Sequence, residues 1–201
     1  MINSRRRFLA ATAMLGIPAG ALRAHSGTLP TPGMTAGPFY PESFSADPVG
    51  NLVRGPLKGN IVLLRLEGRV ADRRGRGVEG ARVEIWQCDG LGRYTHSRDG
   101  QPADRDPNFA GFGWVRTDAK GAYAFSTIRP VVYTGRTPHI HVAVKARGHT
   151  NLVTQMFIEG EPGNASDSLY RSLSAQQRAL LTAAIAAEGS GQRARFDLTL
   201  A

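Results

Sequence analysis

The sequence contains a single cysteine, Cys88, among 201 residues. An intramolecular disulfide is therefore excluded, and stability has to come from an apolar core rather than from covalent cross-links. The hydrophobic fraction of 41% and the charged fraction of 20% are typical of a globular protein with such a core. Cys88 stands in the apolar run VEIWQC, which favours a packed, unreactive side chain over a nucleophile.

Long apolar runs are also scarce. The stretch at residues 8–22 is 15 residues long and contains Pro18, whereas a membrane-spanning helix needs roughly 20 apolar residues. The adjacent Arg5 and Arg6 before it resemble a twin-arginine export signal. We therefore expect residues 1–24 to be a removable signal peptide and the mature protein to be periplasmic or extracellular, with no stable membrane insertion after processing. This route exports folded proteins, often with a cofactor bound, so the resemblance also favours a cofactor.

An excess of positive charge is present but mild. The formal net charge is +9. Removal of the predicted signal peptide takes away four arginines and no acidic residue, which leaves +5. This charge is dispersed along the chain, so the sequence does not indicate a nucleic-acid partner.

The chain is organised as an arm followed by one domain. Residues 25–60 are rich in proline and glycine without a sustained period, which predicts an extended arm, either loose or laid over the domain. From residue 61 onward, short runs with strand-like composition alternate with turn residues, which predicts an all-β, antiparallel β-sandwich over residues 61–201. The predicted strands are 61–70, 81–88, 112–117, 122–128, 139–146, 152–160 and 194–200.

Two local features refine this prediction. The Lys120-Gly121 turn between two predicted strands indicates a β-hairpin. Residues 175–187 carry Leu180, Leu181 and Ile185 at helical intervals, which predicts one short C-terminal helix.

Two histidines stand one residue apart in the segment RTPHIH. In a strand, His139 and His141 project from the same face, and Ile140 projects from the other. Two imidazoles side by side form half of a common kind of metal site. Two partly exposed strand histidines are an equally good interpretation of this motif alone. The other two histidines of the predicted domain, His96 and His149, are expected at the surface.

Four further polar residues surround this motif in the sequence. Tyr133 precedes His139 by six residues, and Tyr94 lies in a loop after another predicted strand. Arg136 stands three residues before His139, and Gln155 lies in the next predicted strand. Taken alone, Arg136 is a surface arginine in an arginine-rich chain, and Gln155 either orients a ligand or bonds to a strand backbone.

Together these residues carry a resemblance to a known family. The segments GPFYP, VEIWQCDGLGRYTH, FGWVRTDAKGAYAFSTIRPVVYTGRTPHIHVAV and VTQMFIEGEP are similar to the intradiol ring-cleavage dioxygenases, the catechol and protocatechuate dioxygenase family. The similarity runs from about Thr35 to the C-terminus. It implies a prealbumin-like sandwich and one non-haem ferric ion per chain. The implied metal ligands are Tyr94, Tyr133, His139 and His141.

The resemblance also implies roles for the neighbouring residues. Arg136 and Gln155 match positions that line the substrate pocket and assist catalysis, and Tyr133 leaves the metal and takes a proton from the substrate. Tyr40, in GPFYP, is a further candidate for the pocket, with burial under the arm as the alternative. The ferric ion is a hard acid that favours anionic oxygen donors, and two phenolates plus a hydroxide neutralise its charge.

The implied reaction uses a small aromatic diol and O₂. The ring opens between the two hydroxyl-bearing carbons, and both oxygen atoms enter a cis,cis-muconate-type diacid. Two alternatives remain open from the sequence: an exported prealbumin-like binding or spacer module, and a zinc or copper protein without oxygenase activity. The natural diol and assembly into a homo-oligomer also stay open.

Overall fold

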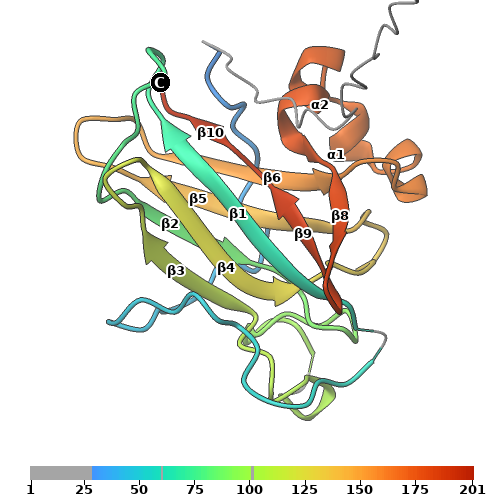
Figure 1. The fold of residues 1–201 in the computed structure, drawn as a ribbon. Helices are drawn as coiled ribbons and strands as arrows, with labels where there is room; N and C mark the ends of the chain where they lie inside the picture. Colours follow the sequence, from blue (N-terminus) through green and yellow to red (C-terminus); the bar gives the residue numbers. More distant parts are fainter. Residues whose placement is uncertain (1–28, 60, 101) are drawn as a thin grey trace, which may run out of the picture.

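The computed structural model describes residues 29–59, 61–100 and 102–201, so the predicted signal peptide lies outside the described residues. Two β-sheets pack face to face, and the helices α1 and α2 lie together at one end (Figure 1). The strand-rich fold agrees with the all-β prediction. None of the described helices has the length and apolar character needed to cross a membrane.

The first sheet, here called sheet I, is built around the long strand β1. Strand β4 pairs antiparallel with β1, and β9 and β10 pair parallel with it, while β8 pairs antiparallel with β9. Leu64, Leu66 and Val70 of β1 point into the core, and the residues between them face outward, which is the expected period of two. The strands of sheet I are β1 (Leu63–Ala71), β4 (Ala122–Ile128), β8 (Ile185–Glu188), β9 (Gly191–Arg195) and β10 (Leu198–Thr199).

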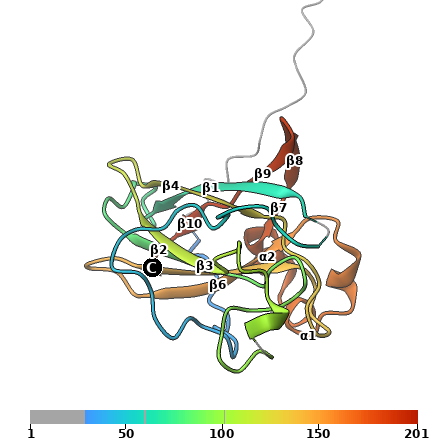
Figure 2. The same cartoon turned by 90° about the horizontal axis from the view of Figure 1, so that it is seen from below.

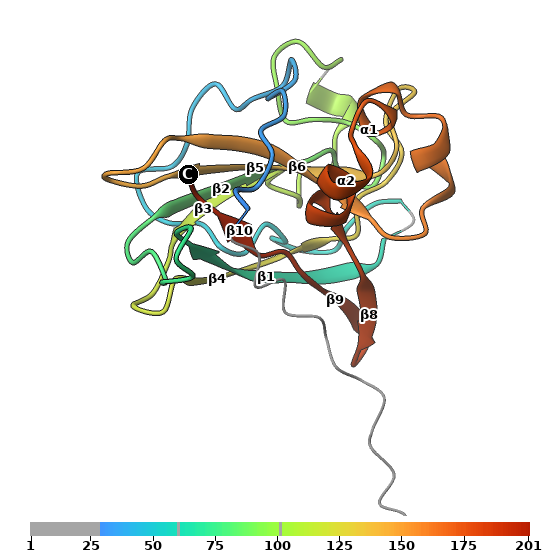
Figure 3. The same ribbon diagram turned by 90° about the horizontal axis from the view of Figure 1, so that it is seen from above.

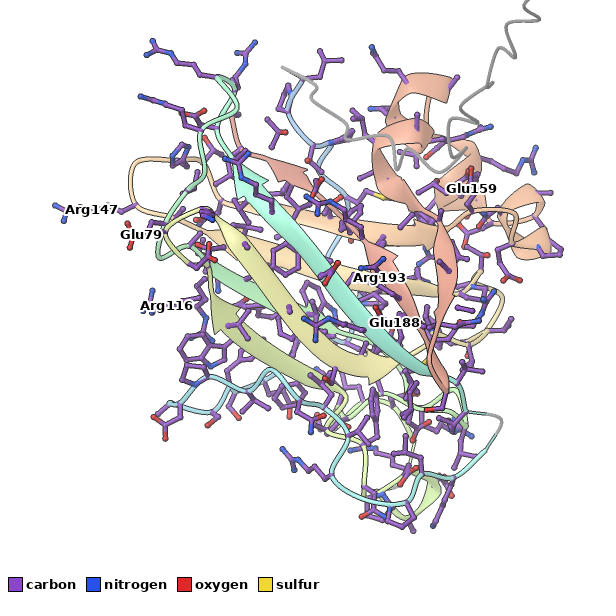
Figure 4. All side chains as sticks on the ribbon, in the orientation of Figure 1. Glu79, Arg116, Arg147, Glu159, Glu188 and Arg193 are labelled. Atoms are coloured by element: carbon purple, nitrogen blue, oxygen red, sulfur yellow. The ribbon has the colours of Figure 1, made fainter. Side chains whose placement is uncertain are left out.

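The β8–β9 hairpin projects from the body of the sandwich (Figures 2 and 3). Glu188 of β8 and Arg193 of β9 lie beside each other on this hairpin (Figure 4). Their Oε1 and Nε atoms are 3.5 Å apart, and both side chains are exposed. Such a solvated ion pair contributes little to stability.

The second sheet, sheet II, has the strand order β3-β2-β5-β6-β7. Neighbouring strands are antiparallel except β6 and β7, which are parallel. The strands are β2 (Arg82–Trp86), β3 (Phe112–Arg116), β5 (His139–Lys145), β6 (Leu152–Ile158) and β7 (Thr182–Ala183).

Strand β5 is buried on both faces. Ile140, Val142 and Val144 belong to the main hydrophobic core between the sheets. His139 and His141 project from the opposite, outer face and are nevertheless buried. The outer face of sheet II is therefore covered by other parts of the chain, and this cover makes a second, smaller interior.

The described part of the arm, residues 29–59, supplies much of that cover. Its first half runs along the side of sheet II that faces away from β1 and β4 (Figures 2 and 3). The Thr31 amide donates to the Thr199 carbonyl at 2.9 Å, and the Met34 amide donates to Val153 at 2.8 Å. Further along, Leu52 is fully buried and belongs to the main core. Of the two interpretations of the arm, the structure favours the one in which it is laid over the domain.

Three expectations about the strands and helices are wrong. The sandwich is not purely antiparallel, because β9 and β10 run parallel to β1, and β7 runs parallel to β6. A period of two predicts a strand whichever way it runs, so the pattern cannot give its direction.

The expected hairpin around Lys120-Gly121 does not form either. The turn exists, with the Asp118 amide donating to the Ala122 carbonyl at 3.0 Å. However, β3 pairs with β2 in sheet II and β4 pairs with β1 in sheet I. The turn therefore carries the chain from one sheet to the other.

The predicted single helix over 175–187 is too long. Helix α2 (Ala175–Leu181) begins with a capping box between Ser174 and Gln177, as its sequence suggests. It ends at Leu181 because the following residues pair as β7 and β8, so tertiary pairing overrides the helix propensity of the alanines. A second α-helix, α1 (Ser168–Arg171), precedes it, and two 3₁₀ turns occupy Pro102–Asp104 and Pro162–Ala165.

The burial of Leu52 predicts that the arm contributes to global stability. Leu52→Ala should lower the free energy of unfolding by about 2–5 kcal/mol, because it leaves a cavity in the shared core. Leu29→Ala is the matched control, since Leu29 is 43% exposed and should change stability by less than about 0.5 kcal/mol. Urea denaturation followed by circular dichroism measures both. Equal effects of the two substitutions would contradict the packing of the arm.

Candidate metal centre

The four side chains expected to bind a metal meet on the outer face of sheet II. His139 and His141 come from β5, and their ring centroids are 4.8 Å apart. Tyr94 follows β2, Tyr133 follows β4, and these two rings are 5.0 Å apart. Each tyrosine also lies beside a histidine. The ring centroids of Tyr94 and His141 are 6.2 Å apart, and those of Tyr133 and His139 are 6.3 Å apart. The structure therefore brings all four rings into one cluster.

The imidazole nitrogens are placed to share an ion. The two Nε2 atoms lie 3.2 Å apart. Metal–imidazole bonds are about 2.1 Å long, so two such nitrogens held at a right angle are separated by roughly 3 Å. Nδ1 of His139 lies 2.7 Å from the Thr137 carbonyl and donates to it. This bond keeps the proton on Nδ1 and leaves the Nε2 lone pair free for a metal.

Burial sets the protonation states of this cluster. Burial lowers the pKa of His139 to about 4 and holds the pKa of His141 well below its usual range, so both rings are neutral at pH 7. Burial also raises the pKa of Tyr94 and, to a smaller degree, of Tyr133. These phenols therefore keep their protons unless a strong cation lies beside them.

The loop that carries Tyr94 is shaped by buried carboxylates. Oδ1 of Asp89 accepts from the amides of Leu91 and Arg93, both at 2.9 Å. Asp99 accepts from the amide of Tyr94 itself. Tyr94 is only 2% exposed, so its ring is fixed by this loop and by packing.

Tyr133 sits in a tighter and more exposed turn. The Arg136 amide donates to the Tyr133 carbonyl at 2.8 Å. Thr134 has a φ of 24° and Gly135 a φ of 72°. Both residues therefore have a positive φ, which residues other than glycine rarely adopt. Because this turn also carries Arg136, it presents the Tyr133 phenol and a guanidinium to the same cluster.

Arg136 is held by two side chains, Gln155 and Asp167. Its Nη2 donates to Oε1 of Gln155 at 2.8 Å, and its Nε donates to Oδ2 of Asp167 at 2.7 Å. The side-chain Nε2 of Gln155 also donates to the Thr35 carbonyl of the arm at 3.0 Å. Both ends of Gln155 are thus engaged, and it orients Arg136 and anchors the arm at once.

Asp167 is a site residue that the sequence did not reveal. Its side chain is fully buried and accepts from Arg136, from the Thr137 amide and from the Tyr170 amide in the first turn of α1. Burial by itself raises a carboxyl pKa, but these hydrogen bonds outweigh it and lower the pKa of Asp167 below its ordinary value of 3.8. It remains ionised opposite Arg136.

The arm places Phe39, rather than Tyr40, against the cluster. The Phe39 ring lies 4.9 Å from Tyr94 and 5.8 Å from Tyr133. The Tyr40 hydroxyl instead donates to Glu84 at 2.7 Å, and the side chain is only partly buried. His96 is wrongly expected at the surface: it is 5% exposed and lies 5.6 Å from Phe39.

The other isolated residues behave as packing residues. Cys88 is 2% exposed, and burial raises the pKa of its thiol to about 12, so it is not a nucleophile at neutral pH. His149 is partly exposed. Throughout residues 29–59, 61–100 and 102–201, no group of three or more histidine, cysteine or carboxylate side chains could hold a metal ion. The cluster described above is instead two histidines with two tyrosines.

This donor set fits a ferric ion. Two neutral imidazoles offer nitrogen lone pairs, and two phenols offer oxygens that a strong cation can deprotonate. Hard, highly charged cations prefer such anionic oxygens over thiolates.

Comparisons with known proteins agree with this arrangement. The profile of a family described as Dioxygenase (Dioxygenase_C) matches residues 36–201. The beta chain of protocatechuate 3,4-dioxygenase from Burkholderia cepacia is 40% identical over 124 residues, which cover 58% of this chain and 52% of that one. Hydroxyquinol 1,2-dioxygenase from Corynebacterium glutamicum is 31% identical over 193 residues, covering 82% and 62% respectively. The chain thus spans little more than half the length of these relatives.

Solved structures give the same result. The dioxygenase domain of a dioxygenase and carbohydrate-binding protein fusion from Streptomyces sp. SirexAA-E has a TM-score of 0.70 and 32% identity, covering 85% of this chain and 97% of that domain. An intradiol ring-cleavage dioxygenase from Tetranychus urticae shares the fold, with a TM-score of 0.69 and 21% identity over 86% and 94% of the two chains. The chain belongs to the intradiol ring-cleavage dioxygenase family.

The ionised state of Asp167 gives a pH-dependent prediction. Asp167→Asn should lower the free energy of unfolding by about 3 kcal/mol at pH 7, because Arg136 loses its buried partner. Since the folded pKa of Asp167 is lowered, this stabilisation is present above pH 3.8 and is lost as the pH falls through the folded value. Denaturant titrations should show that wild type and variant differ less in their free energy of unfolding at pH 3 than at pH 7.

Asp47→Asn serves as the control for this titration, because Asp47 is exposed on the arm. It should leave the unfolding free energy within about 0.5 kcal/mol of the wild type at both pH values. A difference between wild type and Asp167→Asn that stays constant with pH would contradict the role assigned to the ionised carboxylate.

Proposed function

We propose that this protein is a non-haem ferric dioxygenase that opens small aromatic diols between their two hydroxyl-bearing carbons. Both atoms of O₂ enter the product, a cis,cis-muconate-type diacid. The observation that carries the proposal is the cluster of Tyr94, Tyr133, His139 and His141, with the Arg136 guanidinium presented to it by the same turn as Tyr133. Membership of the intradiol family supports the general reaction.

The four ring side chains would hold the ion. When bound, the ferric ion would gather both hydroxyl oxygens of a diol and draw electron density from its ring, which prepares the ring for O₂. Nε2 of each histidine contributes a lone pair, and the Thr137 carbonyl keeps the His139 proton on Nδ1. Phe39 lies against both tyrosines and limits the access of water to them.

The two tyrosines are suited to different tasks. Tyr94 is almost completely buried and fixed by its loop, so its oxygen serves as a permanent ligand. Tyr133 is partly exposed and lies in the short turn after β4, so its ring has more freedom to move than the ring of Tyr94. We assign to the Tyr133 oxygen the acceptance of one proton from an incoming diol hydroxyl, because a diol has to be deprotonated to chelate a cation.

Arg136 would act on the negative charge that develops on the substrate. Its bonds to Asp167 and Gln155 fix the plane of the guanidinium before substrate arrives. A preorganised cation in a buried site stabilises developing charge more strongly than water does. Arginine suits this task because its charge persists at any working pH.

The location and partners of the protein follow from the proposal and from the N-terminal pattern. We propose export by the twin-arginine route, with the ferric ion as the cofactor loaded before export. The substrates are then a diol and O₂ outside the cytoplasm. The protocatechuate and hydroxyquinol enzymes among its relatives define the first diols to test.

Phenolate bound to ferric iron absorbs visible light, which provides a direct test of the ligands. The iron-loaded protein should be red-brown, and Tyr94→Phe or Tyr133→Phe should weaken or remove that absorption. Tyr123→Phe is the matched control, because Tyr123 is buried like Tyr94 but lies on β4 and donates to the Phe196 carbonyl. A colourless, iron-free wild type from iron-replete cells would instead support the spacer module or a zinc or copper site.

Turnover tests the reaction itself. With catechol, protocatechuate and hydroxyquinol, the iron-loaded protein should consume O₂ for at least one diol, and ¹⁸O₂ should place both labelled atoms in the ring-opened diacid. Arg136→Gln should keep the iron but lower kcat by roughly 100-fold. Arg129→Gln is the control, because Arg129 pairs with Glu161 instead. Absence of O₂ uptake with all three diols by the iron-loaded wild type would overturn the proposed reaction.

A further inference from the structure

The two histidines of the cluster are oriented by different means. His139 is held by its hydrogen bond to the Thr137 carbonyl. Nδ1 of His141 is also buried, yet it has no hydrogen-bond partner among the described residues. A metal-binding histidine usually donates its second N–H to an acceptor that fixes the ring plane. Something other than a hydrogen bond to the protein has to fix the ring of His141.

The indole of Trp86 takes this place. The rings of Trp86 and His141 are stacked, with centroids 4.9 Å apart and an angle of 6° between their planes. On another side, a methyl group added at Gly37 would lie 3.2 Å from Cε1 of His141, so the arm backbone packs against the imidazole. The ring is therefore confined by a flat aromatic surface and by the arm.

The strand register dictates the stack. Trp86 on β2 and His141 on β5 are directly opposite each other in an antiparallel pair. Opposite residues project from the same face with their Cβ atoms about 5 Å apart, so aromatic side chains there pack together. A change of register by one residue would turn Trp86 into the core between the sheets.

A polar network around the buried Glu84 lies next to Trp86. The Tyr40 ring meets the indole edge-on, with centroids 5.0 Å apart and an interplanar angle of 90°. The Tyr40 hydroxyl donates to Glu84 at 2.7 Å and accepts from Lys145 at 3.0 Å. Glu84 is fully buried and also accepts from Arg82 at 2.6 Å and from Lys145 at 3.0 Å.

The centre of this network is charged. Burial alone would raise the pKa of Glu84, but the hydrogen bonds from Tyr40, Arg82 and Lys145 outweigh it and lower the pKa below 4.5. Glu84 is thus ionised at neutral pH and holds the Tyr40 hydroxyl by a charge-assisted bond. Tyr40 in turn limits the movement of the indole.

We propose that Trp86 is a positioning residue that fixes the ring plane of His141 for metal binding, with Tyr40 supporting the indole by its edge-on contact. The inference rests on the proposed metal site and extends it to two residues outside the ligand set. Trp86 acts through His141 and need not touch the substrate.

The test compares iron binding by four variants with that of the wild type. Trp86→Met replaces the aromatic face by a flexible apolar chain, Trp86→Phe keeps a smaller aromatic face, and Tyr40→Phe removes only the hydroxyl. Trp114→Met is the matched control, because Trp114 is 4% exposed on the same sheet but stacks on Arg82, 3.9 Å away, rather than on a histidine. Each protein is loaded with ferric citrate, titrated with EDTA and examined by electron paramagnetic resonance.

Trp86→Met should weaken iron binding by about 10- to 100-fold, the effect typical of losing a group that orients a metal ligand. It should also change the shape of the ferric resonance. Trp86→Phe should recover most of the affinity, and Tyr40→Phe should broaden the resonance with a smaller loss of affinity. Trp114→Met should lower thermal stability and leave both iron signals as in the wild type.

Several results would overturn the inference. Trp86→Met with wild-type affinity and resonance refutes it, as does an equal loss in Trp114→Met, which would indicate general destabilisation. If Trp86→Met does not fold, Tyr40→Phe decides, and an unchanged resonance there counts against the proposed support. A wild type that binds no ferric iron refutes the proposed function together with this inference. If the wild type binds iron, but no more tightly than Trp86→Met, this inference is refuted and the proposed function still stands.

Discussion

The pairing of β2, β5 and β6 is the constraint on which the rest of the site depends. Their register places Trp86, His141 and Gln155 in one row across sheet II. Since side chains alternate along a strand, His139 joins the same face two residues away. Ile140 points between the sheets and anchors β5 in the main core. The core side of this strand thereby determines where the imidazoles stand on its outer side.

Burial of the outer face gives the cluster its electrostatic character. The arm and the loops after β2 and β4 remove water from the two histidines and from Tyr94. Neutral imidazoles and phenols of raised pKa then lie together in a small interior. Such a group of ligands has little attraction for a weakly charged ion and a strong one for a cation able to displace phenol protons. The covering chain thus adds to the preference of these side chains for a highly charged cation.

Sequence patterns predicted the local features and missed the long-range ones. Alternation located most of the strands, and the His-x-His motif with two tyrosines, read through a family resemblance, gave four residues that the fold brings together. Strand direction and the change of sheet after β3 depend on which partner a strand finds, and no short pattern contains that information. Residues 182–188 illustrate this, because an alanine-rich, helix-like stretch becomes β7 and β8 only by pairing with β6 and β9.

The same limit applies to the site. Asp167 lies outside the segments that carry the resemblance, and Phe39 and Trp86 lie inside them without a distinguishing pattern of their own. The importance of all three residues arises from contacts with residues far away in the chain. His96 shows the opposite case, since a histidine in a polar loop is expected at the surface until Phe39 of the arm is placed over it. Tyr40 was a candidate for the pocket because of its motif, but Glu84 and Lys145 hold its hydroxyl elsewhere.

The bonds between Thr31 and Thr199 have a consequence for the order of assembly. Thr31 donates to the Thr199 carbonyl, and the Thr199 amide donates back to the Thr31 hydroxyl at 2.8 Å across 168 residues of sequence. Contacts of such long sequence separation form late in folding, because the loop between the two residues has to close before the contact is made. The cover over the cluster is therefore completed only after the strands that carry its ligands have paired.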